Sequence, residues 1–169
     1  MNVTLDNYLS EMYPRIMIER TLSPRESCLG RGYECGNGWF PLLDLLCHQI
    51  QTHIDNHSKY QKNEPPIPQV VFLQVKEKFG GLRIYHSGGD DYCQGLIDMA
   101  GCMSYTICEL CSDGGCRHIG HTSGWIQTIC EDCAEKTHRK IKLDKEIRTM
   151  LLKAIRRYNK GIVDFYASR

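Results

Sequence analysis

Apolar side chains recur at helical intervals in three stretches of the first 110 residues. In residues 4–13 we expect Thr4 to cap a helix and Pro14 to end it, with an inner stripe of Leu5, Tyr8, Leu9 and Met12. In residues 39–56 Pro41 suits a first turn, and the stripe is Trp39, Leu42, Leu43, Leu46, Ile50 and Ile54. In residues 90–104 Asp90 is the expected N-cap, and the expected buried stripe is Tyr92, Leu96, Met99, Ala100 and Met103.

Three histidines, His48, His53 and His57, lie along the second of these helices. No cysteine or carboxylate has a ligand-like spacing to them, so the sequence gives little support for a metal role. Asp90 and Asp91 are the only adjacent acidic pair before the cysteine-rich stretch, and helix capping explains them better than a divalent metal does.

Residues 70–87 form two β-rich runs around Gly80-Gly81, which predicts a hairpin with a two-residue turn. In that register Phe79 pairs with Leu82, Lys78 with Arg83, and Lys76 with Tyr85. Alternation predicts an apolar face made of Val71, Leu73, Val75, Phe79, Leu82 and Ile84. The polar face is then Gln74, Lys76, Lys78, Arg83, Tyr85 and Ser87. Three cations beside an aromatic ring suit phosphate binding and base stacking; the alternative is an ordinary solvated face with acidic counter-charges from another element.

Two C-x2-C pairs, Cys108/Cys111 and Cys130/Cys133, are separated by eighteen residues. This spacing is typical of a zinc ribbon, in which two tight turns close around one tetrahedral Zn²⁺. Four thiolates leave no open position on the metal, so we expect a structural rather than a catalytic centre. Three further residues between the pairs can ligate a metal, either by exchange into this centre or as part of a second one. They are Cys116, His118 and His121.

The charge of the chain changes sign after residue 135. Residues 1–135 contain ten Lys/Arg and seventeen Asp/Glu, whereas residues 136–169 contain eleven and three. Asp144 is the expected cap of a basic helix that reaches about Asn159, with Ile162 starting a short apolar run after it. Such a helix suits an acidic partner, with Arg148, Arg156 and Arg157 as candidate binding residues, or it covers the acidic body of its own fold.

Length and composition suit one compact domain. The 169 residues include only four Phe and two Trp, so we expect a metal to help hold the fold. No run approaches the ~20 apolar residues that span a bilayer, and no basic region with an apolar run marks a secretory signal. Ten cysteines then indicate thiolates and metal rather than disulfides, so we expect a cytoplasmic protein with no membrane partner.

The predicted fold class is α+β, with a small hairpin-containing sheet, flanking helices and an inserted zinc ribbon. Residues 1–107 are expected to form the α+β body, residues 108–133 the ribbon, and residues 134–169 a basic helix packed on the body. All three are expected to belong to a single domain.

Within residues 108–133 the order C-x2-C, His-x2-His, Gly, C-x2-C resembles the ββα-metal nucleases of the phage endonuclease VII type. In that family a zinc ribbon frames a catalytic histidine and a divalent metal, so the resemblance implies a role for His118 or His121. Two positions depart from the family pattern. Arg117 stands where an acidic residue precedes the first histidine, and Ala134 stands where an asparagine follows the last cysteine.

Over about residues 33–134 the chain resembles a family of small phage and prophage proteins. The resemblance rests on GWFPLLDLLC at 38–47, QVKEKFGGLRIY at 74–85, and Gly124-Trp125 before the second cysteine pair. It implies a phage origin, a compact zinc-ribbon domain and residence in the host cytoplasm, but no mechanism. The additions particular to this chain are the ribbon tip and the basic C-terminal segment.

These features favour a non-enzymatic binding protein, a host-directed (anti-defence) inhibitor that engages DNA, RNA or a nucleoprotein machine. Its expected binding residues are Lys76, Lys78, Arg83 and Tyr85, together with the three arginines of the basic helix. One alternative is a nuclease that uses His118 or His121. Another is a pocket on the same hairpin face that sequesters a small anionic nucleotide.

Overall fold

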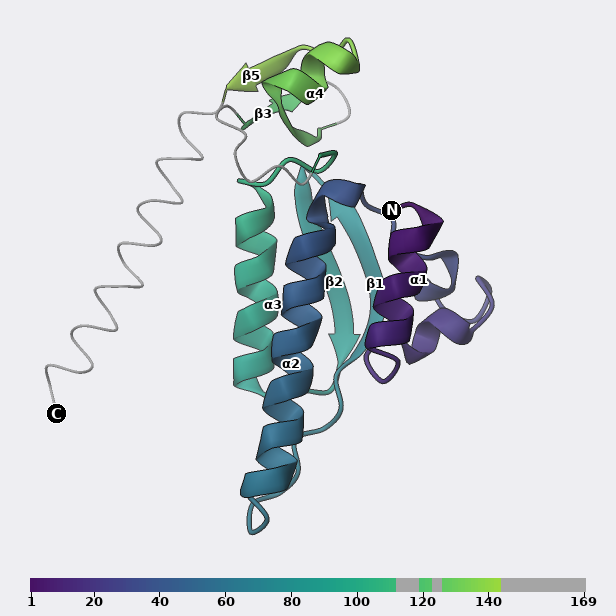
Figure 1. Ribbon diagram of the computed structural model, residues 1–169, viewed down its shortest axis with the longest axis vertical. Helices are drawn as coiled ribbons and strands as arrows, with labels where there is room; N and C mark the ends of the chain where they lie inside the picture. Colours follow the sequence, from purple (N-terminus) through teal and green to yellow (C-terminus); the bar gives the residue numbers. More distant parts are fainter. Residues whose placement is uncertain (112–118, 123–125, 144–169) are drawn as a thin grey trace, which may run out of the picture.

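A computed structural model describes residues 1–111, 119–122 and 126–143 of the chain. It has an α+β fold made of a helix–hairpin body and a smaller unit around the four cysteines (Figure 1). We call residues 1–107 the body, and we call the described residues from 108 to 143 the cysteine unit. The basic helix expected from Asp144 to Asn159 and the apolar run after it lie outside the described residues.

The body contains three α-helices and one antiparallel hairpin. In chain order these are α1 (Val3–Met12), α2 (Phe40–Tyr60), β1 (Val71–Lys78), β2 (Gly81–Ser87) and α3 (Asp91–Ser104). Helices α2 and α3 lie side by side across one face of the hairpin, and α1 lies beside β1 (Figure 1). Three 3-10 helices connect α1 to α2: η1 (Ile18–Thr21), η2 (Leu29–Arg31) and η3 (Asn37–Trp39).

Helix α2 is the central element of the body core. All six residues of its predicted stripe are buried, and Pro41 lies in its first turn as expected. Trp39, at the N-cap position, is fully buried. The helix continues four residues past the expected end at Asn56 and stops at Tyr60, where the polar segment 61–69 begins.

The faces predicted for α1 and α3 are wrong in part. Asn2 rather than Thr4 caps α1, and of its stripe Leu9 is buried while Tyr8 and Met12 are exposed. In α3, Asp90 is the N-cap as predicted, but the buried residues are Cys93, Ile97, Ala100 and Ser104. Of the predicted α3 stripe, Tyr92, Met99 and Met103 are exposed.

The face that α3 buries has small side chains, and this explains the difference. The Ser104 hydroxyl accepts a hydrogen bond from the Leu82 amide of β2 (2.8 Å), and a Cβ on Gly101 would lie 3.5 Å from the Leu82 carbonyl oxygen. The helix therefore approaches the hairpin closely along Ala100, Gly101 and Ser104. The larger residues Met99 and Met103 would hold it further away, so they face outward.

The hairpin forms where predicted, but its register is shifted. The turn residues are Phe79 and Gly80, both with positive φ (54° and 78°), and not Gly80 and Gly81. This pattern is that of a type I′ turn, which matches the twist of the two strands. Gly81 is needed in β2 for another reason: a Cβ there would overlap the Tyr105 ring. The shift makes Phe79 67% exposed, although the sequence predicted it to face the core.

A bulge in β1 accounts for the remaining differences on the apolar face. The register slips between Phe72 and Gln74, which leaves Leu73 without a partner in β2. As a result Phe72 and Val75 are both fully buried, whereas Val71 and Leu73 are only half-buried. Leu82 packs in the core as predicted.

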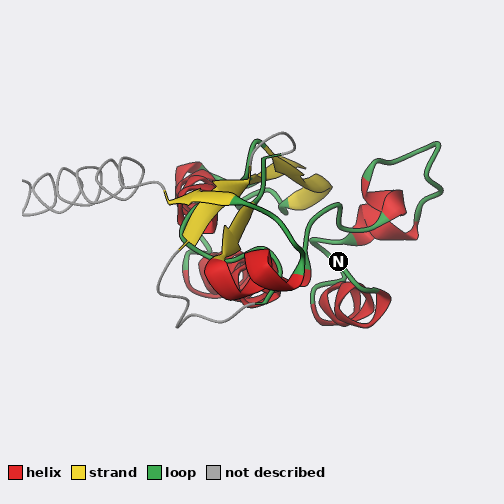
Figure 2. Ribbon diagram, turned by 90° about the horizontal axis from the view of Figure 1, so that it is seen from above, coloured by secondary structure: helices red, strands yellow, loops and turns green. Residues whose placement is uncertain are grey.

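Three short strands and one helix follow in the cysteine unit. They are β3 (Ile119–Thr122), β4 (Thr128–Cys130), α4 (Glu131–Lys136) and β5 (Ile141–Leu143), and the strands form an antiparallel sheet in the order β4-β3-β5. This unit therefore extends past the boundary expected at Cys133, because residues 134–143 form the second half of α4 and all of β5. Viewed from above, its strands lie over one end of the body (Figure 2).

No helix among the described residues is both long and apolar enough to cross a membrane.

Candidate metal centre and cationic face

The four cysteines of the two C-x2-C pairs converge in the cysteine unit. One sulfur from each of Cys108, Cys111, Cys130 and Cys133 lies within 4.8 Å of the other three. The sulfurs of Cys111 and Cys130 are 3.8 Å apart, which is far longer than a disulfide bond of about 2.05 Å. The four residues are thus placed to hold a metal ion, as their spacing predicted.

Local backbone geometry orients these sulfurs. Cys108 and Cys111 lie just after α3, and the Leu110 amide donates to the Cys108 sulfur (3.4 Å). Cys130 ends β4 and caps α4, and its sulfur accepts from the Cys133 amide (3.4 Å). Each pair thus sits on a tight turn whose amides point at sulfur and favour its negative charge.

The surroundings of the four sulfurs oppose their joint ionisation in the absence of a cation. Burial raises the pKa of the Cys108 thiol. Burial also raises the pKa of the Cys133 thiol, and contacts with the other three sulfurs raise it further. Ionised together, the four groups would repel one another at short range, and a metal ion removes that penalty.

The additional ligands predicted between the cysteine pairs fall mostly outside the described residues. This holds for Cys116 and His118. His121 lies in β3, where its backbone pairs with Thr128 and Lys142, but its side chain is not described. The prediction that these residues supplement the centre therefore stays a prediction.

A buried glutamate between the first two cysteines joins the cysteine unit to the body. Glu109 is 3% exposed, and its carboxylate accepts from the Gly36 amide (2.9 Å) and from Nε2 of Gln127 (3.3 Å). Burial raises the pKa of this carboxyl. Beside it, Nε1 of Trp39 donates to the Ile107 carbonyl (3.1 Å). Sequence reasoning missed Glu109, because its partner Gly36 lies 73 positions earlier in the chain.

A second candidate site lies on the face of the hairpin that points away from α2 and α3. The shifted register places Lys76 opposite Arg83 and Gln74 opposite Tyr85, so alternation still puts the predicted residues on one face. The Lys76 ammonium lies 5.3 Å from the centre of the Tyr85 ring. Nη2 of Arg83 donates to the Tyr105 hydroxyl (2.8 Å), which adds a residue that the sequence had not indicated.

The cations of this face lack acidic partners among the described residues. Lys76, Lys78 and Arg83 form none of the ion pairs found in that part of the chain. A nearby carboxylate, that of Glu34, accepts a hydrogen bond from Gln74 (2.8 Å) and forms no ion pair with these cations. The cluster of Lys76, Lys78, Arg83, Tyr85 and Tyr105, which we call the cationic face, therefore keeps its positive charge.

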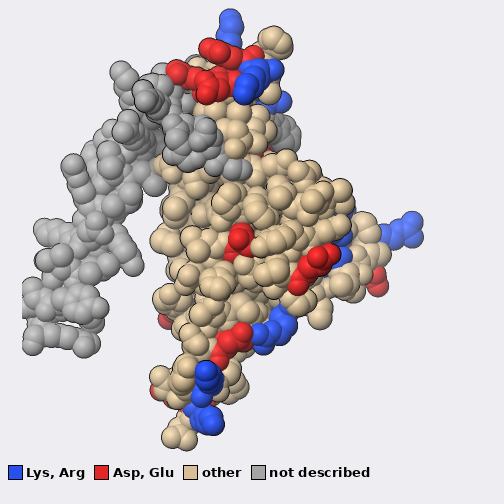
Figure 3. Space-filling model, in the orientation of Figure 1, with Lys and Arg blue, Asp and Glu red and all other residues tan. Residues whose placement is uncertain are grey.

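The opposite side of the body carries little charge. Over α2 and α3, Lys, Arg, Asp and Glu are sparse across the middle and gather toward the lower end, and a second group of charges lies above them on the cysteine unit (Figure 3). The remaining predicted binding residues, Arg148, Arg156 and Arg157, lie outside the described residues.

Comparisons of the chain with family models, with curated proteins and with solved structures find no match. A function for this protein must therefore be argued from the two sites.

Proposed function

We propose that this protein is a zinc-stabilised, non-enzymatic binding protein whose cationic face engages nucleic acid. The observation that carries the proposal is the cationic face itself: three cations without acidic partners among the described residues, interleaved with two tyrosines. The four cysteines serve as the structural centre that fixes the cysteine unit against the body.

Zinc is the metal that the quartet suits best. A tetrahedron of Zn–S bonds of about 2.3 Å has sulfur–sulfur edges of about 3.8 Å. The Cys111–Cys130 separation of 3.8 Å equals that edge. All-sulfur, tetrahedral sites select Zn²⁺ over harder cations such as Mg²⁺ and Ca²⁺. Elemental analysis of the purified chain should give at least one zinc per molecule, with one zinc lost in Cys130→Ser. Iron in place of zinc would refute the assignment.

Nucleic acid fits the cationic face on two counts. Lysine and arginine can neutralise phosphates, and exposed aromatic rings offer stacking surfaces to unpaired bases. Tyr85 is 46% exposed on this face, and Phe79 is exposed at the adjoining hairpin tip. A single strand uses both kinds of contact, whereas a duplex uses mainly the charges. We therefore expect single-stranded DNA or RNA to bind more tightly than a duplex.

Fluorescence anisotropy with labelled single strands at several salt concentrations tests this. The triple variant Lys76→Ala, Lys78→Ala, Arg83→Ala should weaken binding at least tenfold. It should also lower the slope of log K against log salt by about 2, since each lost contact with a single strand removes about 0.7. The matched control removes three exposed cations elsewhere: Arg25→Ala, Lys59→Ala and Lys62→Ala. Equal binding by both triple variants, or binding that ignores salt, would exclude this face as the site.

The resemblance to phage proteins suggests what the bound nucleic acid belongs to. A phage protein of this kind would act on a host nucleoprotein machine, as an anti-defence inhibitor does. Affinity purification from host lysate, with and without nuclease treatment, should recover a complex through the wild-type cationic face and not through the triple variant. A thermal-shift screen with mononucleotides separates this proposal from sequestration of a small nucleotide, which would stabilise the protein without any oligonucleotide.

The nuclease remains a second candidate because the elements β3, β4 and α4 follow one another in ββα order. Ala134 weighs against it, since this residue is buried in α4 and offers no metal ligand where the resembling family has asparagine. Cleavage dependent on Mg²⁺ that disappears in both His118→Ala and His121→Ala would favour a nuclease. If the substrate stays uncleaved after long incubation with Mg²⁺ or Mn²⁺, the nuclease is excluded and the binding role remains.

A further inference from the structure

A second group of metal-binding side chains lies in the body, well apart in sequence from the four cysteines. His53 comes from α2, Asp90 caps α3, and Cys93 lies in the first turn of α3. One donor atom from each lies within 4.8 Å of the other two. We propose that His53, Asp90 and Cys93 form a second metal site, which takes Zn²⁺ or a cation of similar chemistry and keeps one coordination position open.

The three donors need only small movements to coordinate one ion. Nitrogen and oxygen ligands at about 2.0–2.1 Å and a sulfur ligand at about 2.3 Å give donor separations of about 3.3–3.6 Å in a tetrahedron. Nε2 of His53 and Oδ2 of Asp90 are now 2.8 Å apart and share a hydrogen bond. A metal would replace the shared proton, and side-chain shifts of about 1 Å would complete the geometry.

The surrounding structure already holds each donor in place. The other oxygen of Asp90 accepts from the Cys93 amide (3.0 Å), which fixes the carboxylate toward His53. The His53 ring packs 4.3 Å from the Tyr92 ring, and Cys93 is fully buried. Helix capping explains the Asp90 bond to Cys93, and the thiol adds a third donor that capping does not require.

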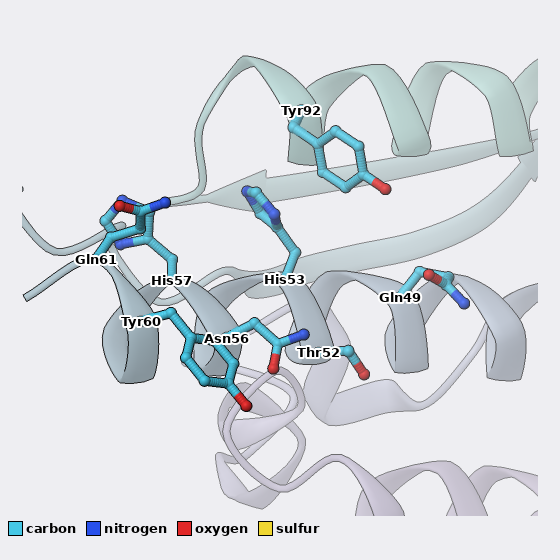
Figure 4. A pocket seen from close by; sticks show the side chains of 8 residues that line it. All are labelled: Gln49, Thr52, His53, Asn56, His57, Tyr60, Gln61 and Tyr92. Atoms are coloured by element: carbon cyan, nitrogen blue, oxygen red, sulfur yellow. The ribbon is translucent and has the colours of Figure 1, made fainter.

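One member of this cluster, His53, also lines a pocket. The pocket has a volume of about 360 Å³ and lies along α2 beside the start of α3, and the neighbouring side chains of His53 and Tyr92 form part of its lining (Figure 4). Its lining is polar and includes Asn56 and His57. Nδ1 of His57 is buried and has no hydrogen-bond partner in the described part of the chain. A fourth ligand from the pocket side, such as water or a small anion, would meet polar groups there.

This arrangement differs chemically from the four-cysteine centre. Four thiolates enclose a metal completely, whereas three protein ligands leave a position for an exchangeable molecule. A mixed nitrogen, oxygen and sulfur set suits Zn²⁺ and Co²⁺, and it disfavours Mg²⁺ and Ca²⁺, which prefer oxygen alone. The proposal does not depend on the metal of the cysteine unit or on nucleic-acid binding.

Cobalt titration of the full chain tests the second site. A mild chelator first removes weakly bound metal while zinc stays in the four-cysteine centre, and elemental analysis verifies that one zinc remains. Added Co²⁺ should then bind with one equivalent and give a sulfur-to-cobalt charge-transfer band from a single thiolate. Cys93→Ser and His53→Gln should each weaken this binding more than about 100-fold, because each removes a direct ligand.

Matched controls lie on the same two helices. Cys102 on α3 and His48 on α2 are exposed, so Cys102→Ser and His48→Gln should bind cobalt like the wild type. Far-ultraviolet circular dichroism reports that the helical body of each variant is folded, and one retained zinc per molecule reports that the four-cysteine centre is intact. A wild-type chain that takes up no cobalt at one zinc per molecule would overturn the proposal. So would cobalt binding that survives both Cys93→Ser and His53→Gln, since the ion would then lie elsewhere.

Discussion

The body and the cysteine unit bury very different amounts of apolar surface. In the described part of the chain, the body core is one cluster of twenty-one buried residues that includes Trp39, Phe72 and Leu43. The core of the cysteine unit has five, and three of those are the cysteines Cys108, Cys130 and Cys133. Only Ile129 and Ala134 remain as buried apolar residues of an ordinary kind.

This difference separates two ways of stabilising a fold. The body can repay the entropy of ordering its chain through apolar burial, at roughly 25 cal/mol per Å². The cysteine unit has too few buried side chains for that, and units of its size commonly need a metal or a disulfide. The two are nevertheless coupled, because the Gly36 and Gly38 amides of the body donate hydrogen bonds to Glu109 of the cysteine unit.

Removing a metal ligand should have the largest effect, because it tests whether the metal rather than packing holds the cysteine unit. Cys133→Ser should unfold the cysteine unit and leave the body folded, since structural zinc supplies about 10–16 kcal/mol in small domains. Hydrogen exchange read by mass spectrometry should show lost protection across β3, β4, α4 and β5, and retained protection in α2. Cys102→Ser, at an exposed cysteine of α3, is the control. Retained protection at β4 in Cys133→Ser would mean that packing alone holds the unit.

The sequence allowed the prediction of those features that short-range chemistry determines. The stripe of α2 was predictable because six apolar residues leave one possible inner face. The cysteine quartet was predictable because a C-x2-C pair can close on a metal within a single turn. The Asp90 cap was predictable for the same reason, as its carboxylate reaches an amide three residues on.

Features that depend on packing between distant segments were not predictable in this way. Gly80-Gly81 allows two turn settings, and the one observed places Gly81 in β2, close to the distant Tyr105 ring. Helix α3 has two overlapping apolar stripes, and its small residues decide which one meets β2. Contacts of Glu109 with Gly36 and of His53 with Asp90 join segments 73 and 37 positions apart, for which no local pattern gives a signal.

A cavity in the body core should destabilise the body and leave the metal centre intact, which is the reverse of what removal of a metal ligand should do. Leu43 is fully buried in α2, so Leu43→Ala should lower the free energy of unfolding by about 2–5 kcal/mol. Urea unfolding followed by circular dichroism measures the change. Metal content should stay at the wild-type value under native conditions, because Leu43 belongs to the body core and not to the core that contains Cys108, Cys130 and Cys133. The exposed Leu45 supplies the control, and Leu45→Ala should change stability by less than about 0.5 kcal/mol.

Glu109→Gln tests how far the two regions depend on each other. Glutamine keeps one carbonyl oxygen for the Gly36 amide but turns a donor toward Nε2 of Gln127, so the Gln127 amide must rotate to accept from it, and both buried hydrogen bonds lose their charged acceptor. We expect a cost of about 1–3 kcal/mol and faster exchange of the Gly36 amide, with the metal retained. Glu135→Gln, on the exposed side of α4, is the matched control. Equal stability of the two variants would show that the junction carries little of the coupling.

The smallest expected effect concerns the pH dependence of the body through Asp90. Its pKa is lowered to about 2, because the hydrogen bonds to His53 and to the Cys93 amide outweigh burial, whereas an unfolded aspartate titrates near 3.9. The ionised carboxylate therefore stabilises the folded state above about pH 4, and this contribution is lost as the pH falls through 2. Asp90→Asn should lose less stability than the wild type over that range. The difference should stay below about 1 kcal/mol, because the carboxylate is 36% exposed and screened.

Urea unfolding between pH 5 and pH 2, with chelator present so that both proteins are free of metal, measures this difference in the free energy of unfolding. The control is Asp91→Asn, one residue along and exposed, which should show the same pH dependence of stability as the wild type. If the stability of Asp90→Asn changes with pH in parallel with that of the wild type, the bond to His53 adds nothing to the stability of the body.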